Sequence, residues 1–209
     1  MKGALSQQTL RHLERFGPRD LVNTAWAFQT LAHCDAHLFA AIRDACNDHM
    51  NQFNAQDVAN TAWVLASQKC REQRLLDALA QQSLKLTEFR ALNLAALAWA
   101  FGVLMFPEQR VLADISAKSV PQIIAGDFDP HSIASIAWSF ATLVYHDAEI
   151  FKVTVDAQWK PQDLANTAWA MTTMQIQIPS MMAQLAHESL QKLHLFRRDE
   201  LEMLLWSLV

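Results

Sequence analysis

The chain has 209 residues, of which 52% are hydrophobic and 18% charged, and its formal net charge is −4 at pH 7. The hydrophobic share is too high for a disordered chain. The acidic balance argues against a protein that coats nucleic acid through positive charge alone, so any nucleic-acid site must be local. With only 4 Gly and 6 Pro, the chain has too few turn-forming residues for a β-sandwich or barrel. Helices are therefore favoured.

Membrane, leader and disulfide signals are weak. The longest apolar run covers residues 94–106, which is shorter than the ~18 residues that suggest a membrane span. The first residues contain no long apolar segment, and Glu14 does not suit an acid-poor transit peptide. Cys34, Cys46 and Cys70 form no CxxC pair. The sequence thus predicts neither a disulfide framework nor a zinc site.

Aromatic residues recur at a fixed spacing along the whole chain. Six tryptophans are separated by 37, 36, 39, 31 and 37 residues, at Trp26, Trp63, Trp99, Trp138, Trp169 and Trp206. Ten residues before each of them stands another aromatic residue: Phe16, Phe53, Phe89, Phe128, Trp159 and Phe196. The chain therefore consists of copies of one unit of about 37 residues.

Each copy has the signals of a helix start. If the residue after the first aromatic caps a helix, Pro18, Pro130 and Pro161 fall at the first helical position, where the missing N–H costs nothing. A mostly acidic position follows two residues later and suits the positive end of the helix dipole: Asp20, Asp57, Asn93, Ser132, Asp163 and Glu200. The next residue is apolar and pairs with the aromatic as a hydrophobic staple: Leu21, Val58, Leu94, Ile133, Leu164 and Leu201.

In chain order, these signals predict a half-copy over 1–15, full copies over 16–52, 53–88, 89–127, 128–158 and 159–195, and a half-copy over 196–209. In each full copy an apolar inner helix, such as 18–32, precedes a more polar, amphipathic outer helix. The outer helices are predicted at 36–50, 74–85, 107–124, 148–157 and 179–193, with Pro121 shortening or kinking the third and the fourth being short. Residues 6–15 are predicted as an outer helix and 197–209 as an inner one.

A helix pair of this size cannot bury its apolar face alone, whereas stacked copies form a continuous core. We therefore predict an all-α chain with one domain. The expected architecture is an α-solenoid, a right-handed superhelix in which inner helices line a concave surface and outer helices a convex one.

The repeated motif NTAW, at 23–26, 60–63 and 166–169, together with the aromatic that precedes it, resembles the octotricopeptide-type repeat. It is also similar to the helical repeats of the FAST-kinase-domain and RAP-domain proteins. The likeness covers nearly the whole chain and is weaker around Ala96 and Met203. It implies an α-solenoid that binds single-stranded RNA in a mitochondrion or plastid and acts in RNA processing, stability or translation. No RAP segment is visible, so no nuclease activity is implied.

The six repeated tryptophans have two interpretations. An indole can stack on a base, which contributes ~1–3 kcal/mol. An aromatic residue at a fixed register of an apolar helix is more often a packing residue between copies, and we expect this role here. On that interpretation, Trp63→Ala should destabilise the chain by ~3–5 kcal/mol.

Polar residues within the apolar helices are the candidate RNA contacts. Asn23, Asn60 and Asn166 could read base edges, or could tie each copy to its neighbour, because buried amides need partners. The Asn residues are identical between copies, which suits a scaffold slightly better than a code. Polar positions that vary are better candidates for discrimination, and these are Arg19, Gln56, His131 and Gln162 near the helix starts and Gln29, Ser67, Thr142 and Thr173 beyond the tryptophans.

Basic residues gather at the starts of the inner helices, namely Arg19, Arg90, Lys160, Arg197 and Arg198. A cation at the start of a helix interacts unfavourably with the positive end of the helix dipole unless an anion binds beside it, so these residues are candidate phosphate contacts. The alternatives are that they are simply solvated or that they form salt bridges to neighbouring acidic residues. His33, Cys34, Asp35 and His37 resemble a metal cluster but occur in one copy only, so we expect no metal. No catalytic motif is visible.

From these residues and the resemblance we predict that the concave face binds single-stranded RNA, with about one base per copy and hence roughly five or six nucleotides. The alternative is a protein-interaction scaffold of the armadillo or TPR type. We expect no enzyme activity, cofactor, membrane contact or small-molecule substrate.

Overall fold

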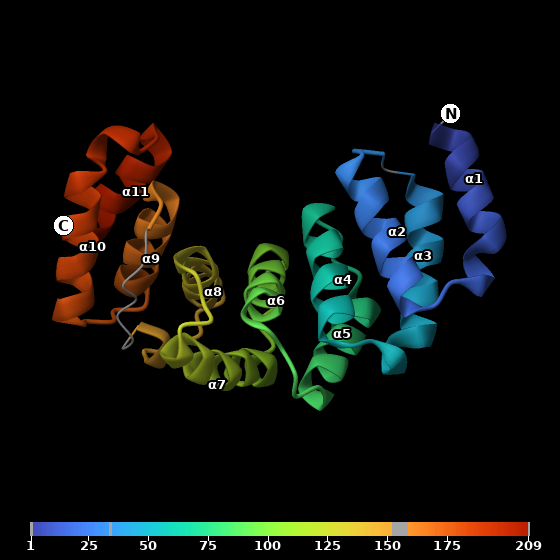
Figure 1. The fold of residues 1–209 in the computed structure, drawn as a ribbon, viewed down its shortest axis with the longest axis horizontal. Coiled ribbons are helices and arrows are strands. Elements are labelled where there is room, and N and C mark those ends of the chain that lie inside the picture. The colour runs from blue at the N-terminus through green and yellow to red at the C-terminus, as the bar shows by residue number, and fades with distance from the viewer. Residues whose placement is uncertain (1, 34, 152–158, 209) are drawn as a thin grey trace.

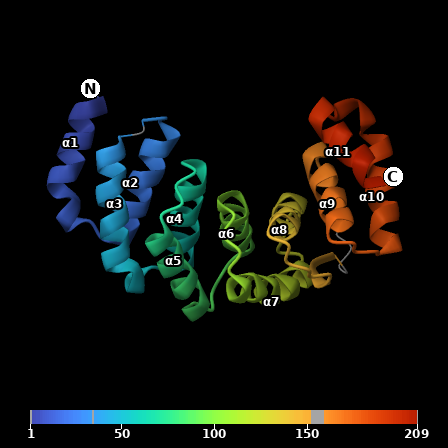
Figure 2. The same cartoon turned by 180° about the vertical axis from the view of Figure 1, so that it is seen from behind.

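The computed structural model describes residues 2–33, 35–151 and 159–208. Within these ranges the chain forms eleven α-helices and no β-strand, which confirms the all-α prediction. Figures 1 and 2 show the helices following one another along a curved row. Their bounds are α1 Lys2–His12, α2 Pro18–Thr30, α3 Ala36–His49, α4 Ala55–Ser67, α5 Gln73–Lys85, α6 Ala91–Leu104, α7 Gln109–Ala125, α8 Pro130–Thr142, α9 Pro161–Thr173, α10 Pro179–Gln191 and α11 Arg198–Leu208.

Six helices, which we call the inner helices, each contain one of the repeated tryptophans: α2, α4, α6, α8, α9 and α11. Each inner helix packs against the next one along the chain. Helices α3, α5, α7 and α10 follow α2, α4, α6 and α9 and pack against them. In Figure 1 the row opens upward, with α4, α6 and α8 toward the opening and α5 and α7 below them. The inner helices therefore form one side of the curve.

Side chains cap the inner helices near the positions that the sequence predicts. In α4, Asn54 Oδ1 accepts the N–H of Asp57 at 3.0 Å, and Asp57 Oδ2 accepts the N–H of Asn54 at 3.2 Å. In four other inner helices the side chain at the third helical position likewise accepts the N–H of the capping residue: Asp20, Asn93, Asp163 and Glu200. In α8, Asp129 Oδ1 instead accepts the N–H of Ser132 at 2.7 Å. The reciprocal pair in α4 and the single bonds in the other five helices fix where each inner helix begins.

Five of the six inner helices end in the same way, with a left-handed residue six positions after the tryptophan. Five such residues have φ between 48° and 56°, and none is glycine: Ala32, Lys69, Met105, Val144 and Gln175. The following N–H then bonds back to the helix, as from Tyr145 to the Phe140 carbonyl at 2.8 Å. This is a Schellman ending, which usually has glycine at the left-handed position.

Val144→Gly should therefore stabilise the chain. Val144 is β-branched, has φ of 56° and is 70% exposed, so glycine relieves backbone strain and loses little burial. We expect the free energy of unfolding to rise by about 1 kcal/mol, as measured by chemical denaturation. As a control, Gly126→Ala places a side chain at φ of 81° in open space and should destabilise. A less stable Val144→Gly protein would contradict this account.

Long polar side chains tie three of the outer helices to their own copies. In three copies a side chain near the end of the outer helix donates to the carbonyl oxygen of the stapling aromatic: Gln82 to Phe53 at 2.9 Å, Gln122 to Phe89 at 2.9 Å and Lys192 to Trp159 at 3.0 Å. These aromatics are buried. The bonds therefore satisfy a buried carbonyl group that precedes the inner helix.

Two outer elements differ from expectation. Helix α7 continues past Pro121 to Ala125, so the proline does not shorten it. The helix predicted over 148–157 begins instead as a 3₁₀ turn, Glu149–Phe151, which packs against α7, and its remainder lies outside the described residues. None of the described helices combines the length and apolar character needed to cross a bilayer.

Candidate functional site

Each inner helix turns one stripe of residues away from the core. The stripe consists of four residues in each helix, counted from the tryptophan. They are the residue seven positions before it, the residue three positions before it, the tryptophan itself and the residue four positions after it, and all four lie on one face of the helix. In α4 these are Gln56, Asn60, Trp63 and Ser67, all exposed or half-buried, whereas Ala59 is buried. We call this face of the six helices the inner stripe.

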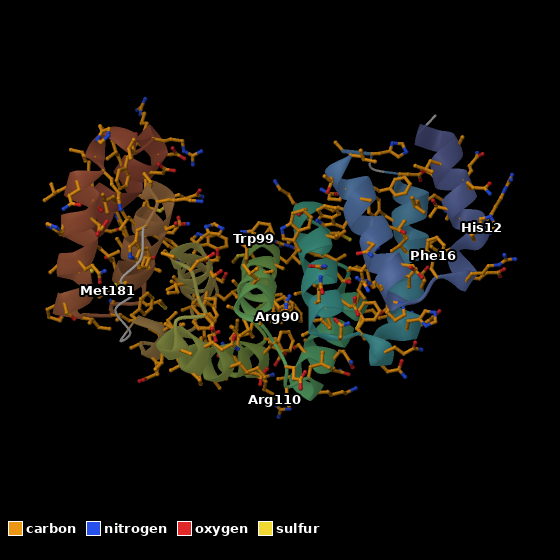
Figure 3. The ribbon with its side chains drawn as sticks, in the orientation of Figure 1. His12, Phe16, Arg90, Trp99, Arg110 and Met181 are labelled. Carbon is orange, nitrogen blue, oxygen red and sulfur yellow. The ribbon has the colours of Figure 1, made fainter. Side chains whose placement is uncertain are left out.

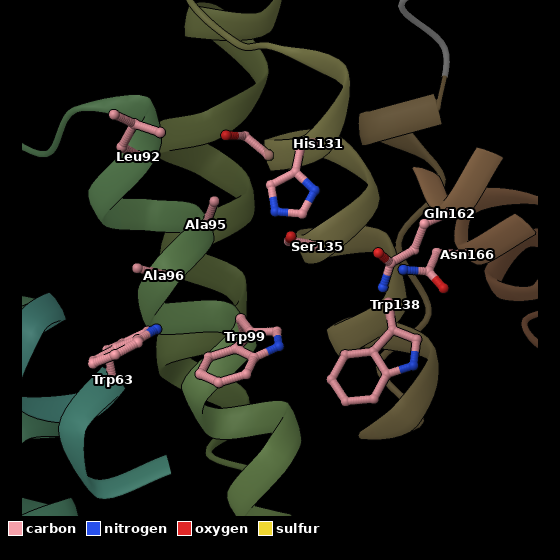
Figure 4. A pocket seen from close by; sticks show the side chains of 11 residues that line it. Trp63, Leu92, Ala95, Ala96, Trp99, His131, Ser135, Trp138, Gln162 and Asn166 are labelled. Carbon is pink, nitrogen blue, oxygen red and sulfur yellow. The ribbon is translucent and has the colours of Figure 1, made fainter. Parts of the chain in front are cut away.

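The repeated tryptophans belong to this stripe and not to the buried core. Trp26 is 50% exposed and Trp206 is 59% exposed. Trp63, Trp99, Trp138 and Trp169 are half-buried. Figure 3 shows Trp99 on the open side of the row, and Figure 4 shows Trp63 and Trp138 on either side of it. The expectation of six packing residues therefore holds only in part: Trp63, Trp99 and Trp169 pack against the core with part of their surface, whereas Trp26 and Trp206 are exposed. Small residues take part in the contacts between copies: Gly102 of α6 lies so close to α8 that an added Cβ would be 3.0 Å from Cζ3 of Trp138.

Three of these indoles line a cavity of about 600 Å³ formed by α4, α6, α8 and α9. Figure 4 shows Trp63, Trp99 and Trp138 in a row along it. The α6 wall of the cavity is apolar, and the α8 and α9 walls are polar: Leu92, Ala95 and Ala96 on the first, and His131, Ser132, Ser135, Gln162 and Asn166 on the others. The cavity thus offers aromatic faces beside hydrogen-bonding groups.

A smaller hollow of about 170 Å³ lies between α2 and α4. It is lined by residues near the starts of the two helices: Arg19, Asn23, Asn54, Gln56, Asp57 and Asn60. Together the two hollows contain seven of the residues predicted from the sequence, three in the larger and four in the smaller.

The repeated Asn side chains make no hydrogen bond within the described part of the chain. Asn23 is exposed, and Asn60 and Asn166 are half-buried on the inner stripe. The threonines that follow two of them, Thr61 and Thr167, are buried in the core. The Asn amides therefore do not tie one copy to the next, and their donors and acceptors are open to a ligand.

Three basic side chains at the helix starts are exposed and have no acidic partner among the described residues: Arg19, Arg90 and Lys160. The other two are paired. Arg197 contacts Glu200 at 3.0 Å, and Arg198 contacts Glu202 at 2.8 Å. Up to three unpaired cations thus lie at the starts of inner helices, where an anion is also favoured by the helix dipole.

One residue of the cavity is held from the next helix. His131 of α8 lies with Nδ1 2.9 Å from Oδ1 of Asp163 in α9. The Asp163 side chain is 3% exposed and that of His131 is 64% exposed. A buried carboxylate thus fixes the orientation of an imidazole that faces solvent.

The other predicted contacts line neither hollow. Gln29 lies one position beside the inner stripe, and its Oε1 is enclosed without a hydrogen-bond partner in the described chain. Thr142 is on the stripe, but its hydroxyl oxygen is enclosed in the same way. Ser67 is half-buried and Thr173 exposed at the ends of α4 and α9.

Titratable groups outside the stripe have structural roles. Asp35 caps α3, and the N–H of Leu38, followed by the Ser6 hydroxyl, lowers the pKa of its carboxyl group. Burial, followed by the charge of Asp57, raises the pKa of the Cys46 thiol to about 12.

The residues that resemble a metal cluster in the sequence are not brought together as one in the described structure. Cys34 lies outside the described residues, and His33 forms a hydrogen bond of 3.1 Å with Ser6. No group of three or more His, Cys, Asp or Glu in the described ranges could hold a metal ion.

The sequence analysis did not identify Ser135 and Leu92 as site residues, although both line the larger cavity. Ser135 stands three positions before its tryptophan, as Asn60 does, and Leu92 stands seven positions before its tryptophan, as Gln56 does, so the repeat spacing could have identified both.

Comparisons with known proteins add no relative: no family model matches the chain, and no curated protein matches it.

Proposed function

We propose that the chain is an α-solenoid, a right-handed superhelix whose inner stripe binds single-stranded RNA in an extended form, about one base per copy. The observation that supports this most is the row of indoles along the cavity beside amide and hydroxyl groups without partners in the described chain. Indole faces accept any base by stacking, and the polar groups can meet base edges. The proposed role is binding without catalysis.

The resemblance to octotricopeptide-type and FAST-kinase-domain repeats supports the same role. By that resemblance we assign the chain to a mitochondrion or plastid, where it would act in RNA processing, stability or translation.

The phosphate backbone contributes little to the proposed binding. Arg19, Arg90 and Lys160 are the three cations without an acidic partner among the described residues at the helix starts. Three phosphate contacts at about −0.7 each give a slope of log K against log salt of about −2 for a single strand. Stacking and base contacts must supply the rest of the affinity.

The test is a fluorescence titration with single-stranded RNA of about twelve nucleotides, repeated as salt rises. We expect binding at low salt, a slope no steeper than about −2, and a weaker slope for Arg90→Gln. Arg110→Gln, on the exposed face of the outer helix α7, is the matched control and should leave the slope unchanged. Absence of binding at low salt would overturn the proposal.

The row of indoles has a test of its own. Trp99→Ala should weaken binding by about 1–3 kcal/mol because a stacking face is lost. Leu190→Ala, whose side chain is 73% exposed on α10, should leave the affinity unchanged. Equal affinities of the Trp99→Ala and wild-type proteins would remove the stacking role.

A second candidate is an apolar peptide partner, which one observation favours. Leu92 is 69% exposed and lies with Ala95 and Ala96 on the α6 wall of the cavity. An exposed apolar wall of this kind suits an apolar side chain as well as a base. A peptide that competes with RNA, in a protein with little affinity for RNA alone, would favour this candidate.

A further inference from the structure

We infer that His131 reads one base of the bound strand and selects adenine or cytosine, the bases whose exocyclic amino group adjoins an accepting ring nitrogen on the Watson–Crick edge. The inference rests on the proposed function, because it concerns the same cavity. The observation behind it is the bond between the exposed imidazole and the buried carboxylate of Asp163. It assigns His131 as a specificity-determining residue and Asp163 as a positioning residue.

The carboxylate of Asp163 has no freedom to turn. Its Oδ1 lies 2.9 Å from His131 Nδ1, and its Oδ2 accepts the N–H of Lys160 at 3.3 Å. Because the second bond caps α9, the carboxylate is fixed to the start of a helix. A carboxylate only accepts hydrogen bonds, so Nδ1 of His131 must be the donor and bears the ring proton in the neutral imidazole.

The other ring nitrogen is then an acceptor. With the proton on Nδ1, Nε2 of the neutral ring has a lone pair. Figure 4 shows the His131 ring at the end of the cavity away from Trp99 and Trp138, with Ser135 between the ring and the indoles. A base that lies in the cavity beside Ser135 therefore meets a hydrogen-bond acceptor whose direction is set from α9.

An acceptor in this place favours an amino group over the edge of uracil. The exocyclic amino groups of adenine and cytosine are donors next to a ring nitrogen that accepts. The hydroxyl of Ser135 and the amides of Gln162 and Asn166, which line the same cavity, can donate to that nitrogen. The N–H of uracil, by contrast, is flanked by two carbonyl oxygens, which the nearby negative charge of Asp163 repels.

The selection is confined to one nucleotide. The equivalent positions of the other inner helices are Arg19, Gln56, Leu92, Gln162 and Asp199, so the fourth copy alone has histidine there. The remaining copies contribute stacking faces and amides that accept several bases. A bound strand should thus show a preference at a single position.

The experiment compares the affinities of single-stranded oligomers of adenosine, cytidine, uridine and purine riboside, the last of which lacks only the amino group of adenosine. At mildly alkaline pH we expect the adenosine and cytidine oligomers to bind about three- to tenfold more tightly than the other two, as for one hydrogen bond. His131→Ala should remove the difference. Nitrogen chemical shifts of the His131 ring, recorded without RNA, should show the proton on Nδ1.

The decisive variant is Asp163→Asn. The introduced amide keeps an oxygen for the N–H of Lys160 and offers its NH₂ group to Nδ1, so the ring proton moves to Nε2 and the preference shifts toward uridine. The matched control is Asp20→Asn, at the same register of α2. No inner helix precedes α2 in the described chain, so Asp20 has no histidine in the place that His131 takes beside Asp163, and the variant should leave the preference unchanged. Thermal melts confirm that both variants fold.

The two proposals fail in different ways. Equal binding of all four oligomers, or a ring proton on Nε2 in the wild-type protein, overturns the reading role of His131 while RNA binding stands. A ring proton on Nδ1 without binding of any oligomer overturns the proposed function and, with it, the role of His131. An unchanged preference in Asp163→Asn despite a reversed ring proton also overturns that role.

Discussion

Replacing Trp159 by alanine is expected to lower the free energy of unfolding by about 3–5 kcal/mol, the cost of a large-to-small change in a core. Trp159 is 2% exposed and is the stapling aromatic before α9. Its carbonyl oxygen accepts a hydrogen bond from Lys192 at 3.0 Å, so the same residue links α9 to α10. The loss should appear in urea denaturation followed by circular dichroism.

The repeated tryptophans provide the comparison. Trp26 is 50% exposed and Trp63 is half-buried, so alanine there should cost less than about 2 kcal/mol. This replaces the larger value that the sequence alone suggests for Trp63. Trp159→Phe should cost under about 1.5 kcal/mol, because the other copies have Phe there and the buried indole N–H has no partner in the described chain. If Trp63→Ala cost as much as Trp159→Ala, the assignment of Trp63 to the inner stripe would be wrong.

Gly102→Ala is expected to destabilise the chain by about 1–3 kcal/mol, although alanine is the better helix former. An added Cβ would lie 3.0 Å from Cζ3 of Trp138, 3.1 Å from Oγ of Ser139 and 3.2 Å from its Cα. The last contact is with the backbone, so α6 and α8 would have to move apart. The measurement is again the free energy of unfolding in urea.

Gly3→Ala is the matched control, because Gly3 is also in a helix and an added Cβ meets nothing within 4 Å. Relief of glycine's conformational entropy should leave this variant as stable as the wild type or up to about 1 kcal/mol more stable. If Gly102→Ala raised the free energy of unfolding as much as Gly3→Ala, the close contact between α6 and α8 at Gly102 would be contradicted.

Helix starts were predictable from the sequence and helix ends were not. Pro18, Pro130 and Pro161 begin α2, α8 and α9 as expected, because proline at the first helical position leaves a local signal. The ends have no such signal, since residues such as Met105 and Val144 occupy left-handed positions where glycine is usual. Only the packing of the following segment specifies that conformation.

The residue types of the candidate site were predictable, but the directions of its side chains were not. The inner helices are apolar around most of their circumference, so the sequence does not reveal which apolar face meets the next copy. The structure buries small residues such as Ala59 and Ala98 and turns Trp63 and Trp99 toward the cavity. Asn60 and Thr61 are neighbours in the sequence, yet Asn60 is half-buried on the open side and Thr61 is buried in the core. The reason is that successive side chains of an α-helix are rotated by about 100° around its axis.

The bonds from Gln82, Gln122 and Lys192 to the carbonyl oxygens of Phe53, Phe89 and Trp159 each begin and end within one copy. Duplicating or excising a whole copy would leave these bonds intact and create only one new junction between inner helices, as in other linear arrays. The number of copies can therefore change by whole units while the bonds within each remaining copy stay the same. The length of the row of indoles would change with the number of copies.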